Sequence, residues 1–449
     1  MARRPPKRAW LVRTLAVTGL TLGLSACGQS DGPTDRITVD RSVANVPFPR
    51  TAAVYLGQST LPSAQTLARY DVVVIDNEWA HRKPGIFGEI RAANPSVKIL
   101  AYISWTDRTD SFAAPTKDPW WSNRNQYLAG IPEQWLATRA DGRAVSEFPG
   151  STMINLTDQA PVVRGQQAWQ FAADWTVEHI LKDRLWDGVM LDVWGDRIFN
   201  PGAQVWDINR DGRDETSDQI YGADRPWERG ASAAEAVIRK RAPNSIVVVN
   251  NVRTFRKSLI DGRVWENFAD DRIGREWAFD VKEYVDGSGD PMRRQPGLQM
   301  TFDHAGTDGG RTPDDLRRAR FYLTSTLLQN GYWSGSGIDY DALPRYDELE
   351  GGGLGRGYLG KPIVESPTRR QLFADFRSGV GQLSGGVFRR DFGAGIALVN
   401  PGERPILVRL GGTFHRISGK IDPTTNNGAV ETEVTVPARD GLILLRDAR

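Results

Sequence analysis

The sequence predicts an α/β fold, a (β/α)8 TIM barrel with rim insertions followed by a small C-terminal antiparallel β-sandwich domain. Two observations favour the barrel. Short apolar runs alternate with helical patterns eight times over roughly 300 residues, and several of these runs end in an acidic residue. Near residue 379 the pattern changes to short alternating runs without helices, which predicts the second domain. A doubly wound open sheet is the alternative, disfavoured because no glycine-rich phosphate-binding turn follows a strand.

The composition is that of a folded protein with many tryptophans. The chain has 449 residues, of which 40% are hydrophobic and 25% are charged, so it can bury a large core. Its 15 tryptophans can fill that core or stack on the apolar faces of sugars. The four histidines are dispersed, which disfavours a zinc hydrolase. The sequence has neither a Gly-x-Ser-x-Gly elbow nor a Gly-Lys-Ser/Thr phosphate loop, which disfavours serine hydrolases and nucleotide binding.

The N-terminus has the pattern of a bacterial signal peptide. Five basic residues precede an apolar stretch from Leu15 to Leu24, which is too short to span a bilayer, since spanning takes roughly 20 apolar residues. The stretch ends in Leu-Ser-Ala-Cys, which resembles a lipobox with Cys27 as the lipidated residue. An ordinary signal peptide with an incidental cysteine is the alternative. We therefore expect an extracytoplasmic, membrane-anchored lipoprotein on the cell surface or the periplasmic face.

Four segments follow from these patterns: a lipoprotein signal peptide at 1–26, a flexible tether at 27–49, the barrel at 50–378 and the β-sandwich domain at 379–449. Cys27 is the only cysteine, which excludes intrachain disulfides and thiol catalysis. Without the five cations of the signal peptide, 57 basic residues fall to 52 against 55 acidic ones, so the mature net charge is near −3. This balance gives no indication of nucleic acid as a partner.

The predicted barrel strands are near-continuous apolar runs, as expected for parallel strands covered on both faces. They span residues 52–57, 71–76, 98–104, a run ending at Asp192, 245–250, 264–268, 298–303 and 331–334. Helices are predicted over 161–182 and 312–329, the second with a Thr-Pro-Asp-Asp start and an Asn-Gly stop. The excursion over 105–150 is too long for a simple connector and predicts a functional rim loop.

Two carboxylates are the candidates for catalysis. Asp192 ends a predicted barrel strand, where side chains point into an active site. Glycoside hydrolysis uses two carboxylates, one as a protonated acid and the other as a nucleophile or base. Glu266 lies between Trp265 and Asn267 in an otherwise largely apolar strand, and burial beside tryptophan would raise its pKa and suit a general acid. A structural pairing is the alternative role for either carboxylate.

Other residues at the same strand ends are candidates for substrate binding. Carboxylates and amides there can hold sugar hydroxyl groups, and aromatic rings can form walls against sugar faces. Core packing is the alternative for each aromatic residue. The candidates are Asp76, Tyr102, Trp105, Trp194, Asn250, Asp303 and Trp333. Asp303 is also the alternative to Glu266 as the second catalytic carboxylate.

A segment over 207–218 has the ligand spacing of a calcium-binding loop. Its oxygen donors would be Asp207, Asn209, Asp211, the backbone carbonyl of Arg213, Glu215 and Asp218. Gly212 occupies the position of the sharp turn, and aspartate replaces the usual glutamate at the twelfth position, which shortens the reach of that ligand. The pattern predicts a structural Ca²⁺ ion and no organic cofactor. A solvated acidic loop is the alternative.

Several of these stretches resemble a known family. Asp-Gly-Val-Met-Leu-Asp at 187–192 and Ala-Tyr-Ile-Ser at 101–104 resemble strand signatures of glycoside-hydrolase-like (β/α)8 proteins. Tyr-Asp-Glu-Leu at 346–349, Arg-Arg-Asp-Phe at 389–392, Val-Asn-Pro at 399–401 and Pro-Ala-Arg-Asp-Gly-Leu-Ile-Leu at 437–444 resemble their tail. The chain is thus similar to a hypothetical glycosyl hydrolase group of the TIM-barrel clan. The resemblance implies a carbohydrate substrate and a catalytic role for Asp192.

We therefore predict a lipid-anchored glycoside hydrolase that cleaves O-glycosidic bonds of an extracellular or cell-envelope polysaccharide by a two-carboxylate mechanism. Asp192 would be the nucleophile or base and Glu266 the acid. The alternatives are a non-catalytic glycan-binding surface lipoprotein and a calcium-stabilised scaffold for cell-envelope partners. The C-terminal β-domain is expected to support the barrel, with carbohydrate binding as its alternative role.

Overall fold

The computed structural model describes residues 38–39, 46–110, 122–250, 259–270, 274, 276–288, 292–295, 297–303, 310–337 and 340–446. The predicted signal peptide, Cys27 and most of the tether lie outside these residues. No helix within the described ranges is long and apolar enough to cross a membrane. The lipid anchor at Cys27 stays a prediction.

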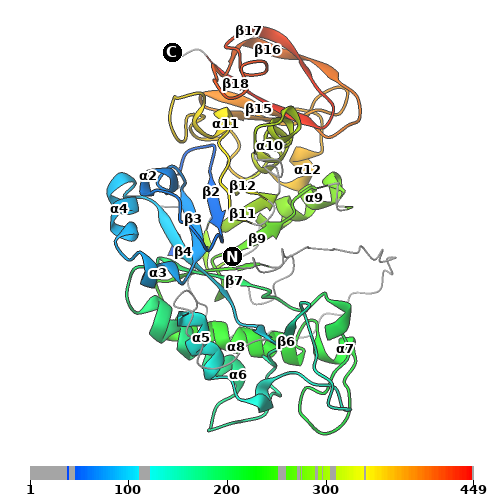
Figure 1. Ribbon diagram of the computed structural model, residues 1–449. Helices are drawn as coiled ribbons and strands as arrows, with labels where there is room; N and C mark the ends of the chain where they lie inside the picture. Colours follow the sequence, from blue (N-terminus) through cyan, green and yellow to red (C-terminus); the bar gives the residue numbers. More distant parts are fainter. Residues whose placement is uncertain are drawn as a thin grey trace.

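Eight parallel strands form the predicted barrel (Figure 1). Their order in the sheet is β12-β11-β9-β8-β7-β4-β3-β2, and a parallel bridge between Thr51 and Trp333 joins the two ends. The strands are β2 (Ala52–Tyr55), β3 (Val72–Asp76), β4 (Lys98–Ser104), β7 (Gly188–Asp192), β8 (Ile246–Asn250), β9 (Gly262–Glu266), β11 (Leu298–Asp303) and β12 (Tyr332–Gly335). The (β/α)8 prediction is confirmed.

Burial on both faces explains why the strands could be predicted from apolar runs in the sequence. All five residues of β3 and of β7 are buried. Gly188 opens β7 because a Cβ there would lie 1.9 Å from the carbonyl oxygen of Ile246 on the neighbouring strand. Strand β9 begins at Gly262 rather than at residue 264, so Glu266 is its last residue and not its middle. That shift places Glu266 at the same rim as Asp192.

The helices of the described residues lie mainly around the barrel and on its rim. They are α2 (Ala64–Leu67), α3 (Trp79–Arg82), α4 (Ile86–Ala93), α5 (Ser122–Ala129), α6 (Ala168–Thr176), α7 (Ser217–Ile220), α8 (Pro226–Arg241), α9 (Trp277–Ser288), α10 (Pro313–Thr326), α11 (Asp347–Glu350) and α12 (Arg369–Leu372). The helix predicted over 161–182 starts seven residues late, because Arg164 and Gly165 have φ values of 53° and 81° in a turn. Its last turn, Val177–Leu181, is a π-helix.

The rim excursion after β4 contains secondary structure of its own. Strand β5 (Asp107–Thr109) pairs antiparallel with β6 (Ser151–Met153). The Glu78 carboxylate accepts hydrogen bonds from the backbone N–H groups of Asn123 and Arg124 at the start of α5, at 3.1 and 2.7 Å. These bonds fix α5, and with it Arg124, next to the carboxyl ends of β3 and β4.

The C-terminal domain is one antiparallel sheet of six strands with the order β13-β14-β15-β18-β16-β17. The strands are β13 (Val380–Gln382), β14 (Phe388–Phe392), β15 (Gly395–Asn400), β16 (Ile406–Arg416), β17 (Val430–Val436) and β18 (Asp440–Leu445). Its own core includes Ile396, Val408, Phe414 and Leu442. The prediction of an antiparallel β-domain after the barrel is confirmed. The boundary at 379 stays a prediction, although the sheet begins at Val380.

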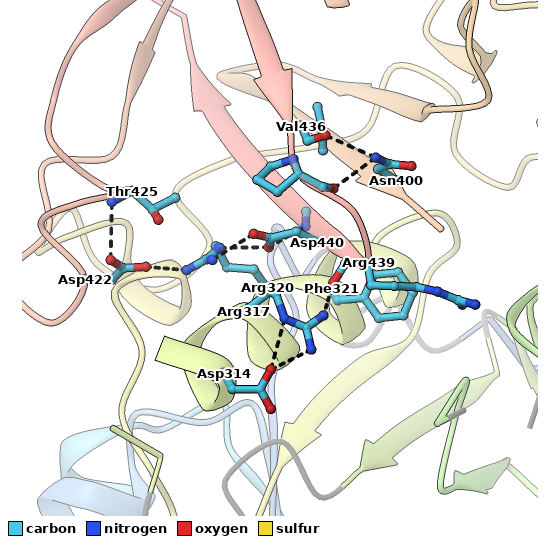
Figure 2. A network of polar contacts seen from close by, with 12 residues as sticks. Asp314, Arg317, Arg320, Phe321, Asn400, Asp422, Thr425, Val436, Arg439 and Asp440 are labelled. Atoms are coloured by element: carbon cyan, nitrogen blue, oxygen red, sulfur yellow. Dashed lines mark hydrogen bonds and ion pairs between the residues drawn. The ribbon is translucent and has the colours of Figure 1, made fainter. Parts of the chain in front are cut away.

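Buried polar groups join α10 of the barrel to the C-terminal sheet (Figure 2). Arg320 of α10 binds the carboxylate of Asp440 in two parallel hydrogen bonds of 3.0 and 2.9 Å, and it also pairs with Asp422. Arg390 of β14 is fully buried and donates to the carbonyl oxygens of Leu327 and Gln329 just beyond α10, at 3.0 and 2.6 Å. Buried charged side chains therefore connect the barrel to the C-terminal domain.

Candidate active site

Asp192, Asn250 and Glu266 meet at the carboxyl ends of three consecutive strands, β7, β8 and β9. The side-chain nitrogen of Asn250 donates to Oδ1 of Asp192 at 2.9 Å and to Oε2 of Glu266 at 2.8 Å. One amide group thus holds both predicted catalytic carboxylates. The arrangement follows from the fold, because parallel neighbouring strands end at the same rim of a barrel.

Two tyrosines bind the outer oxygens of the same carboxylates. The hydroxyl group of Tyr102, on β4, donates to Oδ2 of Asp192. The hydroxyl group of Tyr340, in the loop after β12, donates to Oε1 of Glu266 at 2.7 Å. A chain of hydrogen bonds therefore runs from Tyr102 through the two acids and Asn250 to Tyr340.

Asp192 is a buried carboxylate that accepts several hydrogen bonds. Burial raises its pKa above the ordinary value, and hydrogen bonds from Tyr102, from Asn250 and from the backbone N–H of Val193 oppose that rise. The Val193 N–H lies 2.9 Å from Oδ1, in a residue whose φ is 53°. Hydrogen bonds to a carboxylate favour its ionised form. Three donors therefore prepare Asp192 to act as an anion.

A small cleft lies beside this chain of hydrogen bonds. Its lining includes Asp76, Tyr102, Ser104, Trp105 and Arg124. Asp76 therefore faces the cleft, as expected for a residue at the end of β3. Tyr102 lies in the same lining, although its hydroxyl group is bonded to Asp192. These two substrate-binding assignments stay predictions.

Trp105 and Trp194 pack against each other. Their ring centroids are 5.0 Å apart at an interplanar angle of 84°, and each side chain is 1% exposed. The indole N–H of Trp194 donates to Glu235 of α8 at 2.9 Å. Trp194 therefore has a packing role, whereas Trp105 also lines the cleft. The substrate-binding assignments of the two rings stay predictions.

Asp303 and Trp333 form a closed pair. The indole N–H of Trp333 donates to Oδ2 of Asp303 at 2.7 Å. Trp333 is 1% exposed and Asp303 is 0% exposed. This contact gives both residues a packing role, while substrate binding by either, and Asp303 as the alternative to Glu266, stay predictions.

Asn250 and Tyr340 have roles that the sequence did not indicate. Asn250 was predicted to bind sugar hydroxyl groups, but both of its N–H groups are directed at the two carboxylates. Tyr340 was not a candidate at all, because it follows the last barrel strand and lies 74 residues from Glu266 in the chain. The one signal that could have found it is its place in a loop at the carboxyl end of a strand.

In the predicted calcium loop, acidic side chains accept hydrogen bonds from backbone N–H groups of the loop itself. Asp207 accepts hydrogen bonds from the N–H groups of Asp211 and Gly212 at 3.1 and 2.8 Å, and Asp211 accepts one from Arg213 at 2.9 Å. Glu215 accepts the N–H of Ile208 at 3.0 Å. In the described part of the chain, no three His, Cys, Asp or Glu side chains converge for a metal ion. The ion site at Asp207, Asn209, Asp211, the backbone carbonyl of Arg213, Glu215 and Asp218 is therefore not preformed by converging carboxylates.

Calcium binding by this loop stays a prediction with a direct test. If the ion binds only the folded protein, Ca²⁺ at 100 times its dissociation constant should add about 2.7 kcal/mol to the free energy of unfolding. Thermal unfolding with Ca²⁺, with Mg²⁺ and with chelator measures this effect. Asp218→Ala, at the exposed twelfth position, should remove the calcium effect and leave the unliganded melting temperature unchanged. Equal melting curves with and without Ca²⁺ would contradict the prediction.

A sequence model of the family described as hypothetical glycosyl hydrolase family 15 matches residues 91–396. This span includes both carboxylates, Asn250 and Tyr340. No curated protein matches the chain.

Solved structures of glycoside hydrolases are similar to the chain at low identity. The glycoside hydrolase domain of PelA from Pseudomonas aeruginosa is 17% identical, with a TM-score of 0.41, covering 65% of this chain and 96% of its own. Amy13B of Eubacterium rectale is 9% identical, with a TM-score of 0.45, covering 91% and 98%. The α-amylase AmyB from Thermotoga neapolitana is 11% identical, with a TM-score of 0.44, covering 89% and 99%.

Proposed function

The chain belongs to hypothetical glycosyl hydrolase family 15, and from this membership we propose that it hydrolyses O-glycosidic bonds of an extracellular or cell-envelope polysaccharide. Asp192 and Glu266 are the two acids of the reaction. The observation that carries the proposal is the shared amide of Asn250, which brings both carboxylates to one point on the barrel rim. The location outside the cytoplasm rests on the signal sequence and on Cys27.

The spacing of the two acids favours retention of the anomeric configuration. Oδ1 of Asp192 and Oε2 of Glu266 bind one nitrogen at 2.9 and 2.8 Å, so these oxygens lie at most about 5.7 Å apart, the sum of the two bonds. Retaining enzymes have carboxyl groups about 5–5.5 Å apart, whereas inverting enzymes need about 6.5–9.5 Å to fit a water molecule. The nearest oxygens of the two acids are thus close enough for the retaining geometry, and we propose direct attack by a carboxylate.

The hydrogen bonds support different catalytic roles for the two acids, with Asp192 as the nucleophile and Glu266 as the general acid. Asp192 receives three donors that stabilise its anion, so it attacks the anomeric carbon as the bond to the glycosidic oxygen breaks. Glu266 transfers its proton to the departing oxygen. In the second step Glu266 takes a proton from water, whose oxygen attacks the same carbon and releases Asp192. Two displacements at one carbon restore its configuration.

The decisive experiment determines the anomeric configuration of the first product released. Purified protein is incubated with a panel of polysaccharides, and ¹H NMR follows the anomeric signals of the released fragments before mutarotation. We expect release from at least one polysaccharide with the anomer of the substrate retained. Release with inversion would contradict the assignment of Asp192 as nucleophile. Binding without release across the panel would instead favour the non-catalytic glycan-binding alternative.

A further inference from the structure

The amide of Asn250 limits where a proton can reside on the two acids. An amide NH₂ group is a donor with two hydrogens and cannot accept at nitrogen. Here it directs one hydrogen at Oδ1 of Asp192 and the other at Oε2 of Glu266. A hydroxyl oxygen is a weaker acceptor than a carbonyl or carboxylate oxygen, so a proton on either inner oxygen would weaken its hydrogen bond to the amide. The inner oxygens are therefore the unprotonated ones.

The outer oxygen of Glu266 faces a partner of a different kind. Oε1 lies 2.7 Å from the hydroxyl group of Tyr340, and a hydroxyl can either donate or accept a hydrogen bond. We propose that the catalytic proton of Glu266 resides on Oε1 and that Tyr340 is its positioning residue, accepting from the protonated acid and donating to the carboxylate. This inference rests on the acid role proposed for Glu266.

The surroundings of Tyr340 hold its hydroxyl group in place. Its N–H donates to the carbonyl oxygen of Gly337 at 3.1 Å, and its own carbonyl oxygen accepts from the N–H of Leu56 at 2.6 Å. Its ring packs edge-on against Phe302, with centroids 5.4 Å apart, and the residue is buried. An anchored backbone and a packed ring leave rotation of the hydroxyl hydrogen as the motion that changes its role.

The phenol remains protonated throughout the reaction. Burial raises the pKa of Tyr340 well above its ordinary value, and the negative charges of Glu266 and Asp192 raise it further. Tyr102 raises it as well. Tyr340 therefore does not supply the proton itself. When Glu266 gives its Oε1 proton to the glycosidic oxygen, the Tyr340 hydroxyl turns from acceptor to donor.

The test is a pair of tyrosine variants whose effects should fall on opposite limbs of the pH–rate profile. A hydrogen bond to an ionised group is stronger than one to its neutral form, by a difference equivalent to about one pH unit. Tyr340→Phe should therefore raise the pKa of Glu266 and move the basic limb of kcat/KM up by about one unit. Tyr102→Phe should raise the pKa of Asp192 and move the acidic limb up instead. Tyr55→Phe is the matched control, because that hydroxyl donates to the backbone carbonyl of Thr60 and touches neither acid; both limbs should stay in place.

A second readout separates failure of this inference from failure of the proposed function. The pKa of Glu266 is followed by ¹³C NMR of labelled glutamate carboxyl groups, assigned with Glu266→Gln, and needs no turnover. A raised pKa in Tyr340→Phe upholds the proton placement even if no polysaccharide is cleaved. Active Tyr340→Phe protein with an unmoved basic limb and an unmoved Glu266 signal would overturn it. A Tyr340→Phe effect on the acidic limb alone would also overturn it.

Discussion

Hydrolysis by the Asp192→Asn variant is expected to be slower than that of the wild type by on the order of 10⁴-fold, because an amide oxygen cannot form the glycosyl–enzyme bond. Glu266→Gln should lower the rate by about 10²–10⁴-fold, the usual contribution of a general acid. The two carboxylates are so close that the effects should not add. Initial rates on the best polysaccharide and circular dichroism of each variant measure these effects.

Strand β7 provides a matched control for the loss of Asp192. Asp187 precedes the same strand at its opposite end, where its carboxylate binds Arg91 and the N–H of Ile99 at 3.0 and 2.8 Å. Asp187→Asn should therefore leave the rate unchanged. Azide added to Asp192→Ala should restore part of the activity and give a glycosyl azide of inverted configuration. If Asp192→Asn keeps a tenth or more of the activity, the nucleophile is another residue, and Asp76 at the cleft becomes the next candidate.

The barrel was predictable because its strands are buried on both faces. Parallel strands in that position are near-continuous apolar runs, and those at Val72–Asp76 and Leu298–Asp303 match the predicted ranges within one residue. The start of α6 was not predictable from periodicity, because the apolar pattern continues through a turn with positive φ at Arg164. The spacing of apolar side chains does not predict a positive φ at a non-glycine residue, because tertiary contacts stabilise that conformation.

The sequence indicates which residues lie at strand ends but not which of their side chains are enclosed. Strand ends are visible in the sequence, so Asp192 and Asn250 were placed at one rim. Glu266 was predicted inside the strand over 264–268, and it joins them because β9 ends at Glu266. Whether a tryptophan at such an end faces solvent or core depends on the elements packed over it. The sequence pattern of the strand does not predict those elements. Trp194 and Trp333 were thus assigned to substrate although both are enclosed. Tyr340 was missed because loop closure, not periodicity, brings it to Glu266.

Replacing Arg320 by methionine should destabilise the protein by about 3–5 kcal/mol, the cost of leaving a buried charge without its partner. The side chain of Arg320 is 6% exposed, and that of Asp440, its bidentate partner, is 3% exposed. Burial already raises the pKa of Asp440, and Arg320 is the main group opposing that rise. Figure 2 shows Arg320 between Asp440 and Asp422. Methionine would keep an apolar stem there but remove the charge. Urea unfolding followed by tryptophan fluorescence and circular dichroism measures the change.

The next turn of α10 supplies the control for this prediction. Arg317 pairs with Asp314 at 2.7 Å and also donates to the carbonyl oxygen of Arg439. The side chains of Arg317 and Asp314 are 34% and 54% exposed, so Arg317→Met should cost about 1 kcal/mol. The double variant Arg320→Met/Asp440→Leu should be more stable than Arg320→Met alone, because it leaves fewer charges unpaired. A loss as small as that of Arg317→Met would show that the buried pair does not hold the domains together. A full loss in one transition, with both probes coincident, would mean that the C-terminal sheet supports the barrel as one cooperative unit and is not a detachable carbohydrate-binding module.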